Sequence, residues 1–165
     1  MRKTRGVFAF ILFFGVFALY SAAAQSPAAV SGAESGWTKE GLQNIYLEHL
    51  RVEGYVPSID VDGDIQFKVS GDNYFIIIDE NDLQFFQVYT GFSLGAVALE
   101  NALNAANSSN RRSKVAKVTI SPEGPIASIT AELLIDDPKD FAPVFARALS
   151  LMRNAENNFF NFLKE

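Results

Sequence analysis

The stretch IQFKVSGDNYFIII, residues 65–78, predicts an antiparallel pair of strands and with it the class of the fold. Apolar and polar side chains alternate over residues 65–70, which is the period of a strand with one face in water. The segment Gly71-Asp72-Asn73 predicts a turn. Residues 74–78 are apolar at every position, which is typical of a central strand.

Further strands and helices are predicted on both sides of this stretch. A helix is expected to begin near Thr38 and to end at Gly54. It is followed by a strand over residues 55–59, a two-residue turn at Asp62-Gly63 and, beyond residue 78, a strand over 85–90. Within the first helix, His49 lies on or beside the apolar face, where a single histidine is expected to pack rather than to react.

The second half predicts a helix over residues 94–107, a polar loop over 110–114, and strands over 115–120 and 126–135. A last helix begins between Pro138 and Phe141, since Pro143 fits only a first turn. The order is one helix, three or four strands, a helix, two strands and a helix. This order predicts an α+β fold with an antiparallel sheet of five or six strands covered by helices.

The last helix carries apolar residues at alternating spacings of four and three. Such a seam has two interpretations: a surface for a partner or a second copy of the chain, or a helix covering one face of the sheet. The residues of the candidate surface are Phe141, Phe145, Met152, Phe159 and Phe162.

The first 24 residues have the pattern of a signal peptide. A positive start is followed by an apolar run over residues 7–20, which is too short to span a membrane, and by small residues around a cleavage region of Ala22, Ala24 and Gln25. Residues 25–36 are expected to be a flexible spacer, and residues 37–165 a single domain. The prediction is an exported periplasmic or secreted protein of a Gram-negative envelope, without a stable membrane span after cleavage. The alternative is that the segment is retained as an uncleaved membrane anchor.

Composition excludes several functions. The chain has no cysteine and one histidine, so thiolate chemistry and multi-histidine metal sites are not expected. The formal net charge of −5 becomes −8 without the first 24 residues, which argues against nucleic acid as a partner. Arg111, Arg112 and Lys114 form a small basic patch that could dock an acidic partner.

Two motifs imitate catalytic or metal sites. Gly91-Phe92-Ser93-Leu94-Gly95 fits a nucleophile elbow, but no histidine follows it, and Ser93 is interpreted as a helix cap. The acidic run over residues 60–64 resembles a calcium loop, but its glycine is misplaced and its twelfth position is Gly71, so a hairpin tip is expected. No catalytic residue, metal ligand or cofactor is therefore predicted.

Several stretches resemble the YbjN family of bacterial sensory transduction regulators. They are residues 46–55, 60–67, 74–79, 104–107 and 114–118 with Asn110, together with the phenylalanine-rich last helix. The resemblance covers residues 42–162 and implies a fold similar to type III secretion chaperones, with no known catalytic residue. The signal-peptide pattern departs from the cytoplasmic members of that family. The signal peptide, the lack of a catalytic constellation and the implied fold together favour an exported, non-catalytic domain that binds a protein or peptide, in a chaperone-like or regulatory role. The alternative is a periplasmic small-ligand sensor with a pocket lined by Tyr74, Phe86 and Tyr89.

Overall fold

The computed structural model describes residues 36–122, 124 and 126–164. The predicted signal peptide, its cleavage region at Ala22, Ala24 and Gln25, and nearly all of the predicted spacer lie outside the described residues. The description begins at Gly36, one residue before the predicted domain.

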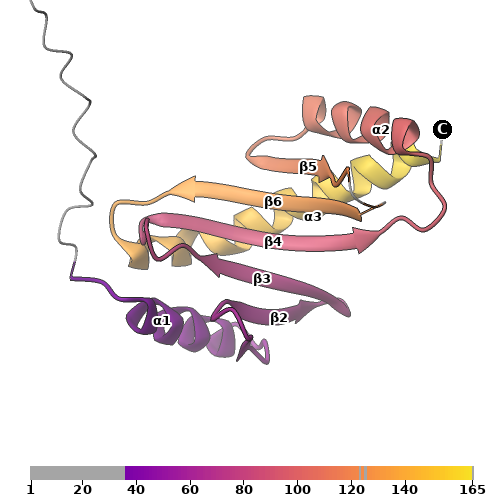
Figure 1. Ribbon diagram of the computed structural model, residues 1–165. Helices are drawn as coiled ribbons and strands as arrows, with labels where there is room; N and C mark the ends of the chain where they lie inside the picture. The colour runs from indigo at the N-terminus through magenta and orange to yellow at the C-terminus, as the bar shows by residue number, and fades with distance from the viewer. Residues whose placement is uncertain (1–35, 123, 125, 165) are drawn as a thin grey trace, which may run out of the picture. The chain divides into compact units, whose positions relative to one another are not determined.

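The domain is built on one six-stranded sheet in which every neighbouring pair is antiparallel (Figure 1). The spatial order is β1-β2-β3-β4-β6-β5, so β4 and β6 lie in the interior of the sheet and β5 is an edge. The strands are β1 (Ser58–Ile59), β2 (Ile65–Val69), β3 (Asp72–Ile78), β4 (Phe85–Ser93), β5 (Ala116–Ile120) and β6 (Ile126–Leu134). The predicted α+β class, strand number and element order are confirmed.

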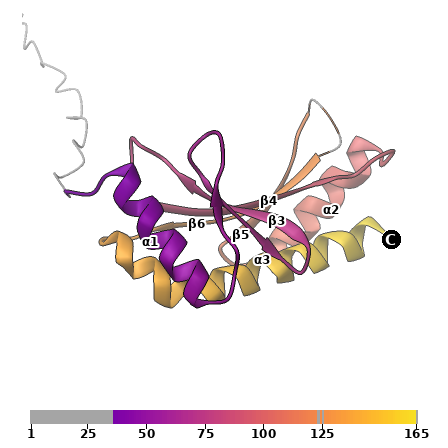
Figure 2. The same cartoon turned by 90° about the horizontal axis from the view of Figure 1, so that it is seen from below.

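The helices cover the sheet from one side (Figure 2). Helix α1 (Lys39–Val52) packs on β2 and β3, whereas α3 (Phe141–Leu163) crosses β4, β6 and β5. Helix α2 (Leu99–Arg112) lies beside β5 and against α3. The fully buried side chains of every long strand accordingly alternate, and they all point to the helix side.

Helix α1 begins and ends as the sequence predicts. The hydroxyl of Thr38 accepts a hydrogen bond from the N–H of Gly41 at 3.0 Å. At the other end Gly54 has a φ of +88°, its N–H donates to the carbonyl of Arg51, and the N–H of Tyr55 donates to that of Leu50. This pair of bonds is a Schellman motif, which requires a left-handed residue where Gly54 stands.

The two hairpin turns differ from their predicted positions. The first is a three-residue loop in which the N–H of Gly63 donates to the carbonyl of Asp60, and Gly63 has a φ of +88°. The two-residue turn is instead Ser70-Gly71, with φ of +53° and +101°, between the paired residues Val69 and Asp72. Two positive φ values identify this second turn as type I′, which matches the twist of the strands.

Strand β4 is longer than predicted, and the following helix begins later. Gly91, Phe92 and Ser93 continue the pairing with β6, and Gly95 has a φ of +60°, which a helix cannot contain. Helix α2 therefore starts at Leu99, and its N-cap, Ala98, makes no side-chain capping bond. The prediction that Ser93 caps this helix is wrong, because Ser93 is the last residue of a strand.

The apolar seam of α3 belongs to the core of the chain itself. Asp137 caps a single 3-10 turn (Pro138–Asp140) that leads into α3. Four of the five candidate surface residues, Phe141, Phe145, Met152 and Phe159, are at most 1% exposed. This burial within one chain favours the interpretation of α3 as a helix that covers the sheet. None of the helices in the described part of the chain combines the length and the hydropathy that a membrane span requires.

Helix α2 protects the edge of the sheet through one asparagine. The Asn110 side chain accepts from the N–H of Val118 at 2.7 Å and donates to the Val118 carbonyl at 2.9 Å. An amide side chain thus occupies the place of a neighbouring strand on β5. One residue earlier, buried Ser109 donates to the carbonyl of Ala155 at 2.8 Å and fixes α2 to α3.

Replacement of Asn110 by alanine should therefore open this edge. We expect Asn110→Ala to lower the free energy of unfolding by about 1–3 kcal/mol, because two partly buried backbone groups lose their partner. Hydrogen exchange of the Val118 amide should accelerate. Urea denaturation and exchange measured by NMR test this, with the exposed Asn107→Ala as control. Unchanged Val118 exchange in Asn110→Ala would contradict the interpretation.

The seam of α3 gives a second prediction. Phe145→Ala should cost about 3–5 kcal/mol of unfolding free energy, because it leaves a cavity among buried rings. Phe162→Ala should cost less, since Phe162 is only half-buried beside the core, with the guanidinium of Arg112 4.6 Å from its ring. Chemical denaturation with sedimentation distinguishes the cases. A Phe145→Ala chain that stays as stable as the wild type but dissociates from a dimer would show that the seam is an intermolecular surface.

Candidate functional site

The face of the sheet opposite α1 and α3 is left uncovered by the described helices. We call it the outer face. Its residues alternate with the buried core positions, and most of them are half-buried. They come from five strands: Gln66, Lys68, Phe75, Ile77, Gln87, Tyr89, Lys117, Ser128, Thr130 and Glu132.

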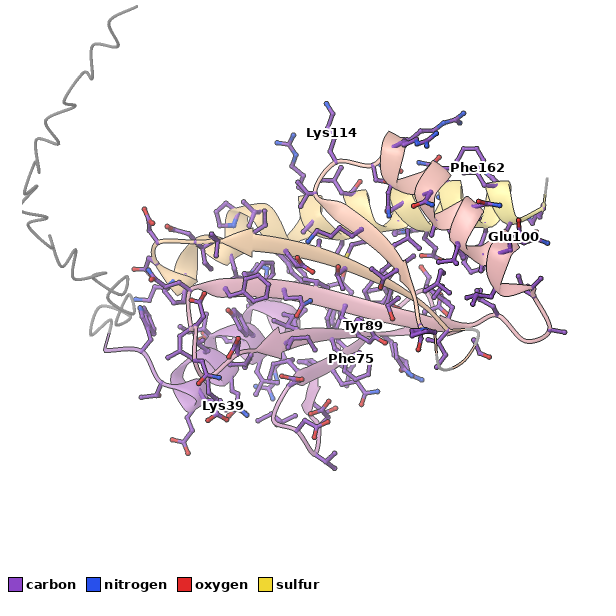
Figure 3. All side chains as sticks on the ribbon, turned by 45° about the horizontal axis from the view of Figure 1, so that its top comes forward. Lys39, Phe75, Tyr89, Glu100, Lys114 and Phe162 are labelled. Atoms are coloured by element: carbon purple, nitrogen blue, oxygen red, sulfur yellow. The ribbon has the colours of Figure 1, made fainter. Side chains whose placement is uncertain are left out.

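One half of the outer face is aromatic. Phe75 and Tyr89 are directly opposite each other on β3 and β4, with ring centroids 5.9 Å apart (Figure 3). The Tyr89 ring also leans over Gly91, where an added Cβ would come within 2.5 Å of the tyrosine oxygen. The hydroxyl of Ser128 lies 3.5 Å from that oxygen. Gly91 thus leaves room for a tyrosine that lies along the sheet.

The other half is a polar network centred on Glu132. Its carboxylate forms an ion pair with Lys117 and accepts from Thr130 at 3.1 Å and from Gln87 at 3.4 Å. The hydrogen bond from Lys117 is the main cause that lowers the pKa of Glu132. The charge of this half is therefore internally balanced, and its polar groups can exchange hydrogen bonds with a docked chain.

The ammonium group of Lys39 lies against the acidic loop that resembles a calcium site. Lys39 of α1 donates from Nζ to Glu80 at 2.7 Å and to the carbonyl of Asp62 at 2.9 Å. A Cβ at Gly63 would lie 2.6 Å from that same Nζ, so the loop closes around the ammonium group. The bond to Glu80 is the main cause that raises the pKa of Lys39. The loop is a hairpin tip, as predicted.

The structure does not bring Ser93 and His49 together. The imidazole of His49 packs on Phe141 at 4.8 Å and on Phe145 at 5.3 Å, on the helix side. The Phe141 ring also contacts Phe86, near the start of β4, whereas Ser93 ends that strand. Seven residues of strand span roughly 23 Å. His49 is a packing residue, as expected, and cannot serve Ser93 as a base.

The pocket expected for a small-ligand sensor does not form from the three predicted residues. Tyr74 and Phe86 are at most 2% exposed and point to the helix side, whereas Tyr89 lies on the outer face. The sheet itself separates them, so this prediction is wrong. Among the described residues, no cluster of three or more histidine, aspartate or glutamate side chains could hold a metal ion.

A buried tyrosine and a partly buried glutamate meet under the sheet. The hydroxyl of Tyr74 donates to Glu156 of α3 at 3.4 Å. Burial raises the pKa of Tyr74 to about 12, and burial together with the nearby charge of Asp72 raises the pKa of Glu156. The positive charge of Arg153 favours the ionised form of Glu156, but its effect is smaller than that of burial and of Asp72.

Comparisons with known proteins leave the family open. No family model matches the chain, and no curated protein matches it. Two chains of solved structures match it. One is described as the structure of the HopA1-SchA chaperone–effector complex, with 8% identity and a TM-score of 0.49 over 74% of this chain and 96% of that chain. The YbjN resemblance therefore stays a prediction, whereas the architecture that it implies is observed.

The outer face could be found only in part from the sequence. The alternation of Gln66 and Lys68 with buried residues indicates a solvent side of β2. Phe75 and Ile77 gave no such signal, because an all-apolar strand does not show which of its faces is covered. The apolar run over residues 74–78 therefore predicted the strand but did not show that Phe75 and Ile77 lie on its uncovered face.

The raised pKa of Glu156 has a consequence for stability. Because the folded-state pKa lies above the ordinary value of 4.5, stability falls as the pH rises through the folded-state pKa. Glu156→Gln removes this dependence. We expect the variant to be more stable than the wild type near pH 7, and the difference to vanish below about pH 4.

Thermal and urea unfolding across this pH range test the prediction. Glu48→Gln, at an exposed position of α1, serves as the control substitution. A Glu156→Gln chain with the same pH profile as the wild type would show that the ionised glutamate is not penalised in the folded protein.

Proposed function

We propose that the chain is an exported, non-catalytic protein-binding domain, and that a polypeptide partner docks on its outer face. The observation that carries this proposal is the one-sided covering of the sheet. Half-buried Phe75, Ile77 and Tyr89 face away from α1 and α3, and no described helix lies over them. A surface with aromatic residues in its middle and polar residues around them is typical of protein interfaces.

The two halves of the outer face define the chemistry of the partner. The aromatic pair of Phe75 and Tyr89 favours apolar side chains. Gln87 and Thr130 offer hydrogen bonds, and Glu132 carries no uncompensated charge because Lys117 pairs with it. The proposed partner is therefore a polypeptide surface with an apolar centre and uncharged hydrogen-bonding groups at its rim. Export rests on the signal-peptide pattern of residues 1–24.

Site-specific photocrosslinking in cells that express the full chain tests both parts. A photoreactive residue at Gln87, in the middle of the outer face, should yield a discrete adduct with another protein in the periplasmic fraction. The same residue at the exposed position Glu48, on the helix side, should yield none. Equal adducts from both positions would contradict the docking face, and adducts confined to the cytoplasm would contradict export.

The partner identified from the adduct then allows a quantitative measurement. With purified components, the double variant Phe75→Ser/Tyr89→Ser should bind that partner about tenfold more weakly or worse, because buried aromatic residues dominate interfaces. A matched double variant at exposed positions, Asn107→Ser/Asn157→Ser, should bind normally. Unchanged binding by the outer-face variant would refute the proposed surface.

A further inference from the structure

A separate groove lies between the end of β6 and helix α3. Its volume is about 270 Å³. Its floor and walls are apolar, formed by Val115, Leu133, Val144, Ala148 and Leu151. The groove is on the helix side of the sheet, because Leu133 is paired with Phe86, a residue of the buried face.

The groove exists because β5 is shorter than β6. On one side β6 pairs with β4 as far as Leu134, but on the other side the pairing with β5 begins only at Ala131 (Figure 1). The chain leaves this position through Val115, which has a φ of +69°, in a tight turn closed by the Ala116 N–H and the Lys114 carbonyl at 2.7 Å. This strained turn leaves Leu133 without a neighbouring strand.

Two cations line the same groove. Lys114 projects from the connection between α2 and β5 (Figure 3), and Arg147 belongs to α3. Neither makes an ion pair with a carboxylate of the described residues, whereas Lys39 and Lys117 are each paired. In a chain of formal net charge −5, this is a local excess of positive charge beside an apolar surface.

We infer that this groove binds an anionic amphiphile, and specifically a medium-chain carboxylate. The alkyl chain lies on Leu133, Val144 and Leu151, and the carboxylate faces Lys114 and Arg147. A volume of about 270 Å³ holds roughly nine groups of the size of a water molecule, which corresponds to a chain of eight to ten carbons.

Three other grooves of the described residues lack the combination of two cations and an apolar floor. The groove of about 460 Å³ beside β1 and β2 has one cation, Lys68, and includes the polar residues Ser58, Gln66 and Asn73. The groove of about 400 Å³ beside α3 contains Asn154, Asn157 and Ser150 together with its one cation, Arg153. The groove of about 280 Å³ between α2 and α3 is lined by Asn101, Asn104 and Ser108. Amide and hydroxyl groups have to stay hydrated, so these surfaces do not favour an alkyl chain.

An NMR titration of the full chain with decanoate, below the concentration of micelle formation, tests the inference. Saturable shifts should be confined to the signals of Leu133, Val144 and Leu151 and their neighbours. In the series from hexanoate to dodecanoate, affinity should rise by up to about fourfold for each methylene group. It should level off near ten carbons, when the groove is full.

Three variants locate the site. Val144→Trp fills the groove and should abolish the shifts, whereas Val52→Trp, at an exposed valine of α1, should not. The charge reversal Lys114→Glu/Arg147→Glu should weaken decanoate about tenfold and should make decylammonium bind instead. Because each substitution lies at an exposed or half-exposed position, the fold is expected to persist, and the amide spectrum verifies it.

Three outcomes would overturn the inference. Shifts that spread over the outer face, or that do not saturate, show nonspecific association. Binding of vesicles rich in phosphatidylglycerol without any saturable decanoate shift assigns this face to a membrane surface. Decanoate binding that survives Val144→Trp places the ligand elsewhere. None of these variants changes Phe75 or Tyr89. The experiments therefore test the groove independently of the proposed protein-binding face.

Discussion

Three aromatic rings from distant parts of the chain meet at one point, and the fold depends on this contact. Tyr46 of α1 lies 4.6 Å from the ring of Phe141 of α3, and both lie within 6 Å of Phe86 of β4. Each ring is at most 2% exposed. The contact joins α1, β4 and α3 on one side of the sheet, so both helices must cover the same face.

This one-sided covering explains where surfaces for binding occur. Helices α1 and α3 cover one face of the sheet, and α2 covers the β5 edge, where Asn110 occupies the hydrogen-bonding groups of Val118. The outer face is left to solvent or to a partner, as is common for antiparallel sheets. The groove at the end of β6 arises differently, since it results from an unequal length of neighbouring strands.

The sequence predicted the elements that depend on local chemistry. Thr38 and Gly54 fix the ends of α1 by their own side chain and backbone, and the alternation of β2 is visible in its residues. The sequence-based prediction was wrong where pairing with residues distant in the chain determines the local structure. Ser93 has the local signals of a helix cap, but it is a strand residue because Ile126 pairs with it. Whether Tyr89 shares a face with Tyr74 depended on the register of β3 and β4.

The two proposed surfaces differ in how their cations are paired with carboxylates. Lys39 is held by the acidic hairpin and Lys117 by Glu132, so these cations are unavailable to a ligand. Lys114 and Arg147 have no such carboxylate among the described residues. An anion is therefore attracted to the groove, whereas the polar half of the outer face has its charges paired and the other half offers aromatic area. A polypeptide on the outer face and an anionic ligand in the groove can accordingly bind to this domain at the same time.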